Sequence, residues 1–475
     1  MEVYVNNQIF VDSYAPTDYY VYFKKHKRGA RMNNSVWNKR FKLEERKTSV
    51  VTEVLAGLTT FATMSYILAV QPSMMADAGM NSLGVFAATA IVAALVSIAM
   101  GLISNAPLAL APGMGDNALV AYTLVGLGLA TWQTCMGMMV FTGGVFLLLS
   151  CFKIREKLAN YLPKSIKLGM SATLGIFLFQ IGMSNTGLLT NGSWGDFSNP
   201  NIVLTLIGLI IAIVLNFIRI DIKGREYKLR GSMLISILLT TIIGAIMGLV
   251  HVDFNIGLKE TFGALGDVAF KADVLGIFKA KYIPYIIIFL VGDFTSTLGT
   301  AMGAGNKAGL MDKDGNMPML GKIFLVDAAG TVIGASMGVT VVTSYAESAA
   351  GVEAGGRTGL TSVVTGLLFV ISLVFAPLFV AIPSAATGPV LLMIGVSCMQ
   401  ELRTLDFDPI NWTPVAFMIG FTAFSGMAIG VTVGLFADII IRVSHYAFKK
   451  DHKREDLPSW PTIILAALMS LQFIL

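Results

Sequence analysis

Two acidic residues lie in segments that are otherwise apolar enough for a lipid bilayer. Glu347 stands in VVTSYAESAAGV (341–352), and Asp293 stands in IIIFLVGDFTSTLGTAMG (286–303). A charged side chain at the bilayer centre costs at least ~2.5 kcal/mol even on the lenient insertion scale, so such acids usually mark a path for a substrate or for protons. A carboxyl group accepts hydrogen bonds when ionised and donates one when protonated. The two acids therefore predict a polar site within the membrane that binds a substrate and exchanges protons.

The composition indicates a polytopic membrane protein. Of the 475 residues, 55% are hydrophobic and 13% are charged, and the mean hydropathy is +0.72. No soluble core buries so large an apolar fraction. The net charge of +5 then belongs to loops and does not indicate a nucleic-acid partner. Cys135, Cys151 and Cys398 show no CxxC spacing, so they predict no disulfide framework, no metal site and no cofactor.

Apolar windows of roughly 17 to 25 residues predict an all-α protein with fourteen transmembrane spans. The predicted spans of the first half are 52–72, 82–102, 109–126, 131–150, 163–187, 201–218 and 231–250. Those of the second half are 280–303, 320–337, 338–354, 358–380, 385–398, 411–428 and 429–445. With this count most Lys and Arg residues fall in the two tails and in the loops on the N-terminal side. Both termini are therefore predicted to be cytoplasmic, and the protein is predicted to lie in the cell membrane.

Seven spans in each half place the second half upside down relative to the first, which is the usual build of secondary transporters. The predicted divisions are a cytoplasmic N-terminal tail (1–50), a first inverted repeat (51–250), an extracellular loop (251–279), a second inverted repeat (280–446) and a cytoplasmic C-terminal tail with an interfacial helix (447–475). In such transporters the substrate binds where the two repeats meet.

Spans three and ten carry the signs of a broken helix. The stretch 105–117 contains Pro107 and Pro112, and the stretch 339–343 is entirely β-branched. Because both features disfavour a regular helix, each span is predicted to contain a short extended segment followed by a half-helix. Exposed backbone is tolerated at membrane depth where it lines a cavity, and the half-helix N-termini would direct N–H groups into that cavity.

Four segments give the chain a resemblance to a known family. They are EVLAGLTTFATMSYILAVQPSMM (53–75), NAPLALAPGMGDNALVAYT (105–123), KAGLMDKDGNMPMLGK (307–322) and DAAGTVIGASMGVTVVTSYAESAAGVEAGGRTGLTSVVTGLLF (327–369). These segments resemble the AzgA-like branch of the nucleobase/ascorbate transporters, which are adenine, guanine and hypoxanthine permeases. The similarity extends from about Phe41 to about Tyr446.

The resemblance implies a fold and an activity. The fold is two inverted seven-span repeats, divided into a core domain (spans one to four and eight to eleven) and a gate domain (spans five to seven and twelve to fourteen). The activity is import of a purine nucleobase by proton symport, with alternating access of the core against the gate.

The resemblance also assigns site residues. The family's acids that bond the base fall on Asp293 and Glu347, which would also couple the proton. Asn117 matches the asparagine of span three, and Tyr345 matches the residue beside the bound ring. The neighbouring Ser344 is included in the predicted substrate site.

Two positions depart from the family pattern. Ser296 stands where the family usually has a second aspartate, and Asp116 stands where it usually has an apolar residue. Asp116 is therefore a further candidate for substrate binding, and the preferred purine and the site of protonation stay open. Tyr345 and Phe294 could supply an apolar face for the ring.

Each candidate also has a structural alternative. Glu347 or Asp116 could cap the half-helix of its own span. Asp293 could pair with a neighbouring helix, and Asn117 could make a plain interhelical hydrogen bond. A brace within the core is the expected role of Asp327.

Two other classes of function are weighed against the purine permease. An anion transporter or channel of the same fold would be expected to carry a cationic residue near the half-helices, where this chain has acids. A membrane enzyme would need a metal-ligand cluster or a nucleophile beside a base, and no such motif appears. The predicted partners are a purine, protons and the lipid bilayer, and a homodimer is possible by analogy with the fold.

Overall fold

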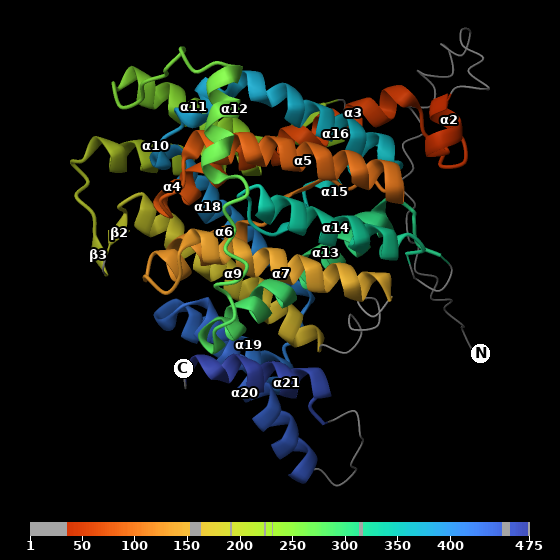
Figure 1. The fold of residues 1–475 in the computed structure, drawn as a ribbon, viewed down its shortest axis with the longest axis vertical. Helices are drawn as coiled ribbons and strands as arrows, with labels where there is room; N and C mark the ends of the chain where they lie inside the picture. Colours follow the sequence, from red (N-terminus) through yellow and green to blue (C-terminus); the bar gives the residue numbers. More distant parts are fainter. Residues whose placement is uncertain are drawn as a thin grey trace, which may run out of the picture.

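The computed structural model describes residues 36–152, 163–190, 192–222, 225–229, 231–312, 317–448 and 457–473. In this part of the chain the protein is a bundle of helices that run side by side, with two-stranded sheets at three places (Figure 1). Most of the predicted N-terminal tail lies outside the described residues.

The first half of the chain contains one interrupted span among its helices. Its helices are α2 (Val36–Phe41), α3 (Val50–Met64), α4 (Ile67–Asp77), α5 (Ser82–Ser104), α7 (Trp132–Cys151), α9 (Lys164–Asn185), α10 (Pro200–Phe217) and α11 (Ser232–Ile246). Between α5 and α7 come β1 (Leu110–Pro112), α6 (Met114–Ala118) and the wide helical turn η1 (Leu119–Val125). Two hairpins, β2–β3 (Leu189–Thr190, Ser193–Trp194) and β4–β5 (Arg219–Ile222, Arg225–Lys228), follow α9 and α10.

The second half repeats this interruption. Its helices are α12 (Leu258–Val268), η2 (Ala280–Tyr282), α13 (Ile283–Lys307), α14 (Leu320–Ser336), α16 (Gly359–Ser372), η3 (Leu373–Phe375), α17 (Ala376–Val380), α18 (Ser384–Met399), η4 (Gln400–Thr404), α19 (Pro409–Ser425), α20 (Met427–Phe448), α21 (Trp460–Met469) and η6 (Ser470–Phe473). Between α14 and α16 come β6 (Val342–Ser344) and α15 (Ser348–Glu353). The extended segments predicted in spans three and ten are thus present.

Nine helical segments of the described residues are long and apolar enough to cross a membrane. They account for nine of the fourteen predicted spans, and the multi-pass membrane protein is established on this ground. The other five predicted spans contain shorter helices (α11, α14 and α19) or the interrupted segments β1–α6–η1 and β6–α15. In the predicted extracellular loop, 251–279, α12 packs on α5.

Polar residues between the apolar runs start the helices. Asn81 accepts the N–H of Leu83 at 3.0 Å before α5, and Asp408 accepts the N–H of Ile410 at 2.5 Å before α19. Such an oxygen satisfies an N–H group that has no partner within its helix, and it therefore fixes where the helix begins.

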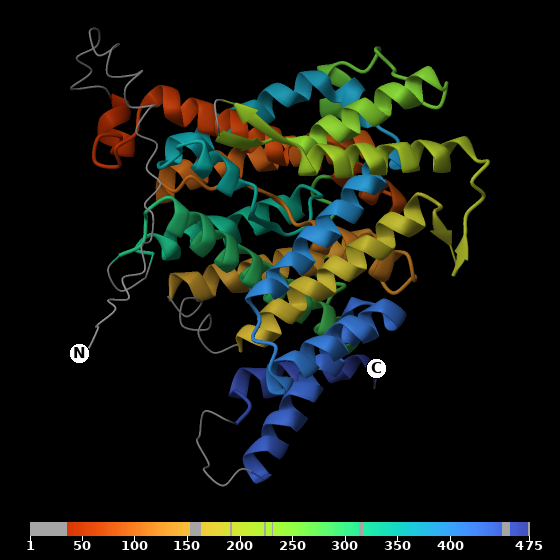
Figure 2. The ribbon, with the colours of Figure 1, turned by 180° about the vertical axis from the view of Figure 1, so that it is seen from behind.

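Helices from the two halves of the chain pack in two groups. The helices α5 and α16 pack closely in the core group, and α9 and α18 pack closely in the gate group (Figure 2). The core group consists of α3, α5, α7, α13, α14, α15 and α16. The gate group consists of α9, α10, α11, α18, α19 and α20. Each pair meets at glycines, because a Cβ on Gly359 would lie 2.0 Å from the Gly101 carbonyl oxygen and one on Gly175 would lie 2.6 Å from that of Gly395. The helices in these two groups are those that the resemblance assigns to the core and to the gate, and the division itself stays a prediction.

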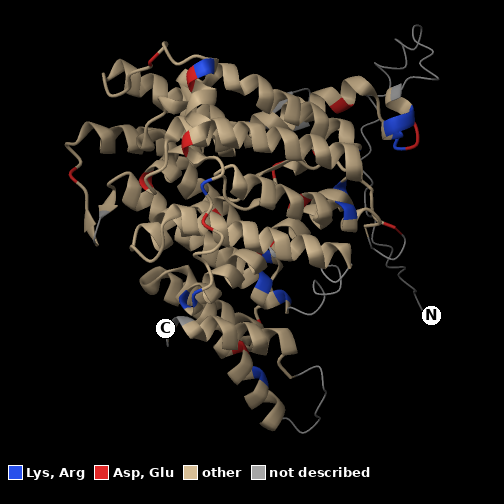
Figure 3. Cartoon of the chain, in the orientation of Figure 1, with Lys and Arg blue, Asp and Glu red and all other residues tan. Residues whose placement is uncertain are grey.

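Charged residues are sparse on the helices of the bundle (Figure 3). Asp438 is fully buried on α20 and accepts a hydrogen bond from Arg442 Nε at 2.9 Å. This pair lies one turn apart on the same helix, so it neutralises a buried charge locally.

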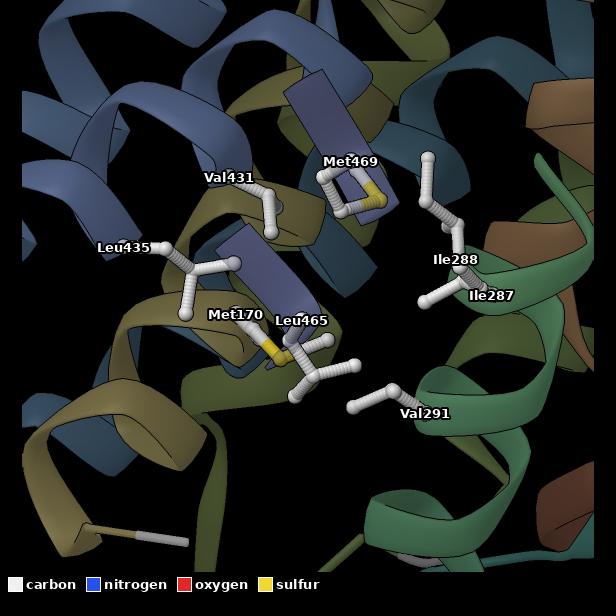
Figure 4. Close-up of a pocket in the computed structure, with 8 residues that line it drawn as sticks. All are labelled: Met170, Ile287, Ile288, Val291, Val431, Leu435, Leu465 and Met469. Carbon is white, nitrogen blue, oxygen red and sulfur yellow. The ribbon is translucent and has the colours of Figure 1, made fainter. Parts of the chain in front are cut away.

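The C-terminal helix α21 packs on α20 and on α13, and the turn η6 that follows it packs on η2. Apolar side chains of α9, α13, α20 and α21 line a pocket, namely Met170, Ile287, Ile288, Val291, Val431, Leu435, Leu465 and Met469 (Figure 4). Since every lining side chain is apolar, this pocket offers no hydrogen bond to a polar ligand. The predicted interfacial position of α21 stays a prediction, but the helix contacts both the core and the gate group.

Candidate functional site

The two broken spans meet as an antiparallel strand pair at the centre of the core group. β1 pairs with β6, and the pairing continues on both sides, where the Gly113 N–H donates to the Val341 carbonyl at 2.8 Å and the Tyr345 N–H donates to the Ala109 carbonyl at 3.0 Å. Because the two strands satisfy each other's backbone N–H and C=O groups, an extended segment is tolerated within the membrane. The half-helices α6 and α15 begin at opposite ends of this pair.

Glu347 lies immediately before α15 and is half-buried. Its Oε1 accepts a hydrogen bond of 2.6 Å from the hydroxyl of Tyr66, which stands at the break between α3 and α4. The Glu347 side chain makes no capping hydrogen bond to α15, so the capping alternative is wrong. Tyr66 lies within a segment quoted for the resemblance, but its type alone gave no sign of this contact.

Asp116 lies within α6 and is half-buried as well. A Cβ added to Gly113 would lie 2.4 Å from Asp116 Oδ2, and one added to Gly292 would lie 3.9 Å from Asp116 Oδ1. The carboxyl group therefore lies between the start of its own half-helix and α13, beside the residue that precedes Asp293. A side chain at position 113 would therefore displace this carboxyl group from its place.

Asp293 is fully buried on α13. The next residue, Phe294, packs its ring against Phe146 and Phe324, with ring centroids 6.4 and 5.8 Å apart. Phe294 thus belongs to the packing between α13, α7 and α14, and the prediction that it flanks a ligand ring receives no support.

One threonine links α13, α14 and β6. The Thr297 hydroxyl donates to Asp327 Oδ1 at 2.5 Å, and since it has a single proton it then accepts from the Thr343 hydroxyl at 2.8 Å. The Ser344 N–H also donates to Thr297 Oγ1 at 3.2 Å. The expected bracing role of Asp327 is confirmed, because Asp327 fixes the end of β6 through Thr297.

The remaining predicted residues differ in how their polar groups are used. Asn117 is fully buried and accepts a hydrogen bond from Thr340, which is the interhelical alternative. The Tyr345 hydroxyl donates its one proton to the Pro112 carbonyl at 2.5 Å, so it has no proton left to donate to a ligand. The Ser344 hydroxyl is buried and has no hydrogen-bond partner among the described residues. Ser344 is therefore the one of the three whose side-chain polar group is not already used in the protein.

The gate group borders this cluster. A Cβ on Gly115 of α6 would lie 2.5 Å from Leu174 Cδ1 of α9, and Cys398 of α18 lies close enough to Glu347 for electrostatic interaction. The half-helix α6, which carries Asp116, and Glu347 thus border the gate group, while Asp116 also lies against α13, which carries Asp293. Among the described residues no group of His, Cys, Asp and Glu side chains could hold a metal ion.

Comparison with known proteins identifies the family of this chain. The model of the Permease family matches residues 51–435. The chain is 34% identical to the adenine permease AdeQ of Escherichia coli, over 92% of this chain and 95% of that protein. It is 33% identical to a putative permease of Methanocaldococcus jannaschii, over 92% and 98% of the two chains. It is also 32% identical to the guanine/hypoxanthine permease PbuG of Bacillus subtilis, over 83% and 91%.

Solved structures share the fold at low identity. The anion transporter SLC26A9 superposes with a TM-score of 0.65 at 12% identity, over 94% of this chain and 74% of that one. The transmembrane domain of the cyanobacterial bicarbonate transporter BicA superposes with a TM-score of 0.56 at 15% identity, over 82% and 97%. At such identities the likeness concerns the fold alone.

Proposed function

Because the chain belongs to the Permease family, in its AzgA-like branch of purine nucleobase permeases, we propose that it imports a purine base together with protons. The observation that carries this proposal is the half-buried Glu347 carboxyl, held at 2.6 Å by Tyr66 where two broken spans meet. An acid at membrane depth is costly and usually marks a path for a substrate or for protons. The site offers a neutral heterocycle hydrogen bonds from both donors and acceptors.

The coupling follows from the two states of Glu347. The Tyr66 hydroxyl donates to one carboxyl oxygen and so stabilises the ionised form, while burial favours the protonated form. A protonated Glu347 can donate its proton in a hydrogen bond to a ring nitrogen or carbonyl oxygen of the base. If the base binds this form more tightly, then by linkage the base also favours proton binding, and the two enter together.

The other residues hold the base in this proposal. Asp293 and Asp116 approach from α13 and α6 and accept from ring N–H groups, with Asp293 as the second proton-coupling acid. Ser344 contributes its free hydroxyl, and the ring of Tyr345 covers one face of the base. Asn117 mainly holds α6 to the segment before β6, so its contact with substrate is the weakest part of the assignment.

The proposal extends to the architecture. We envisage fourteen spans in two inverted repeats, with the core group moving against the gate group to give alternating access, in the cell membrane and with a cytoplasmic N-terminus. The contact of Gly115 with Leu174 and the electrostatic interaction of Glu347 with Cys398 support a site between the two groups. A homodimer would form by analogy with the fold. The anion transporter is not favoured, because acids border the site and the relatives at 30% identity or more include nucleobase permeases.

Uptake into proteoliposomes tests the proposal. Labelled adenine, guanine, hypoxanthine and uracil are offered with and without an inward proton gradient, and a purine should accumulate only with the gradient. Glu347→Gln mimics the protonated acid, so it should still exchange purine but no longer accumulate it. Glu353→Gln is the matched control, since Glu353 lies on α15 but forms an exposed ion pair with Lys307 at 2.8 Å.

Accumulation by Glu347→Gln at the wild-type level would show that Glu347 does not couple the proton. Uptake of every purine at the rate of protein-free vesicles would overturn the proposed function itself.

A further inference from the structure

Gln71 is a buried polar side chain that the site described above does not use. It lies on α4, its side chain is fully buried, and neither its amide oxygen nor its amide nitrogen has a hydrogen-bond partner among the described residues. A side-chain amide carries two donor protons and one acceptor oxygen. Leaving them unpaired in the interior is costly, and buried polar groups almost always have partners. An amide in this state points to a ligand that supplies the missing hydrogen bonds.

Two contacts locate Gln71 along the membrane. At the start of α4, Tyr66 donates to Glu347, and at its end Asp77 accepts a 2.8 Å hydrogen bond from Tyr122 of η1. Because α4 packs on β1, α6 and η1, it runs beside the broken span three from one end to the other. Gln71 is five residues beyond Tyr66, which corresponds to about 7.5 Å at the helical rise.

At that level the neighbour of α4 is the half-helix α6. The segment from Pro112, whose carbonyl accepts a hydrogen bond from Tyr345, to Tyr122 is eleven residues long and runs beside the twelve residues from Tyr66 to Asp77. By this spacing the middle of α4, with Gln71, lies at the level of the middle of the first segment, with Asp116 and Asn117. α4 also packs on α18 of the gate group, so the helix that carries Gln71 lies between elements that border the site.

We propose that Gln71 is a further substrate-recognition residue, which reads an edge of the base where a donor stands beside an acceptor. The inference rests on the proposed function. An amide pairs with such an edge through two hydrogen bonds, with its oxygen accepting and its nitrogen donating, as amide side chains do with adenine in other contexts. Adenine offers this edge through its amino group and the adjacent ring nitrogen, and hypoxanthine and guanine offer it through the ring N–H and the adjacent carbonyl. Unsubstituted purine lacks the exocyclic half of this edge.

The test is binding to the purified full chain, with Gln71→Met as the variant of similar length without hydrogen-bonding groups. Affinity for adenine, hypoxanthine and unsubstituted purine is measured at one acidic pH, together with thermal stability in the absence of ligand. Gln71→Met should weaken binding of the purine that the wild type prefers by on the order of tenfold, and should leave the affinity for unsubstituted purine nearly unchanged. Its stability without ligand should stay equal or rise, because an unpaired buried amide has been removed.

Thr240→Val is the matched control. The Thr240 hydroxyl is also fully buried without a partner among the described residues, but it lies on α11 beside Gly208 of α10. This variant should keep every affinity.

Wild-type affinity of Gln71→Met for all three ligands would overturn the inference. Equal weakening of all three ligands together with a lowered melting temperature would overturn it too, because Gln71 would then be a structural residue. Absence of any purine binding by the wild type would instead overturn the proposed function, and this inference with it.

Discussion

Replacement of Tyr66 by phenylalanine removes one hydroxyl and keeps the ring. That hydroxyl donates a 2.6 Å hydrogen bond to Glu347, and Tyr66 is itself almost fully buried. A hydrogen bond to a charged group contributes about 1.5 to 3 kcal/mol. Because this bond favours the ionised carboxylate, its loss shifts the balance toward the protonated form. At about 1.4 kcal/mol per pH unit, the shift amounts to roughly one to two units.

The account therefore predicts a change in the pH dependence of purine binding. In the wild type, affinity should fall as the pH rises and Glu347 loses its proton. In Tyr66→Phe the same fall should occur at a pH higher by roughly one to two units, with unchanged affinity at acidic pH, where both proteins are protonated. The assay is equilibrium binding of a labelled purine to purified protein across the pH range.

Tyr122→Phe supplies the control, because it removes a hydroxyl that donates to Asp77 at the other end of α4. Its binding curve should follow that of the wild type. A curve for Tyr66→Phe that coincides with the wild-type curve, or that moves to lower pH, would refute the reasoning.

Three further predictions concern packing, access and topology. A Cβ on Gly143 would lie 2.9 Å from Val332 of α14, whereas a Cβ on Gly144 would meet open space. In thermal unfolding Gly143→Ala should therefore cost about 1 to 3 kcal/mol of stability, and Gly144→Ala should be nearly neutral. Bound purine should slow the alkylation of Cys398, because Cys398 lies beside the proposed site. The rate is measured by mass spectrometry in a protein whose exposed Cys151 is changed to serine. An unchanged rate would contradict a site beside α18. The sequence predicts a cytoplasmic C-terminus, whereas η6 contacts η2, which the same topology places on the outer side. We therefore expect Phe473→Cys to react with an impermeant thiol reagent added outside intact cells, and labelling only after permeabilisation would favour the cytoplasmic C-terminus.

Local chemistry made some of these features predictable. Pro112 and the β-branched stretch 339–343 disfavour a helix whatever surrounds them, so the extended segments β1 and β6 could be expected from the residues alone. The cost of an acid in a bilayer singled out Glu347 in the same way. Such arguments need only a residue and its immediate neighbours.

Contacts between distant residues were not predictable in this way. Tyr66 and Glu347 are 281 positions apart, and hydrophobic periodicity gives no sign of which tyrosine meets which acid. The hidden position of Gln71 is of the same kind, since a glutamine in an apolar run can also face a lipid headgroup or a water-filled crevice. The hairpins β2–β3 and β4–β5 were absent from the prediction, because the segments that form them are short and partly polar.

The central claim is that Glu347 takes up a proton as the base binds, and proton uptake on binding measures this directly. Purified protein in weakly buffered solution with a pH indicator is mixed with the preferred purine near the pH at which affinity begins to fall. We predict that the solution becomes more alkaline for the wild type and clearly less so for Glu347→Gln, in which only Asp293 can still take up a proton, although both bind the purine. Purine binding by the wild type without any proton uptake, or an equal uptake by Glu347→Gln, would contradict this claim.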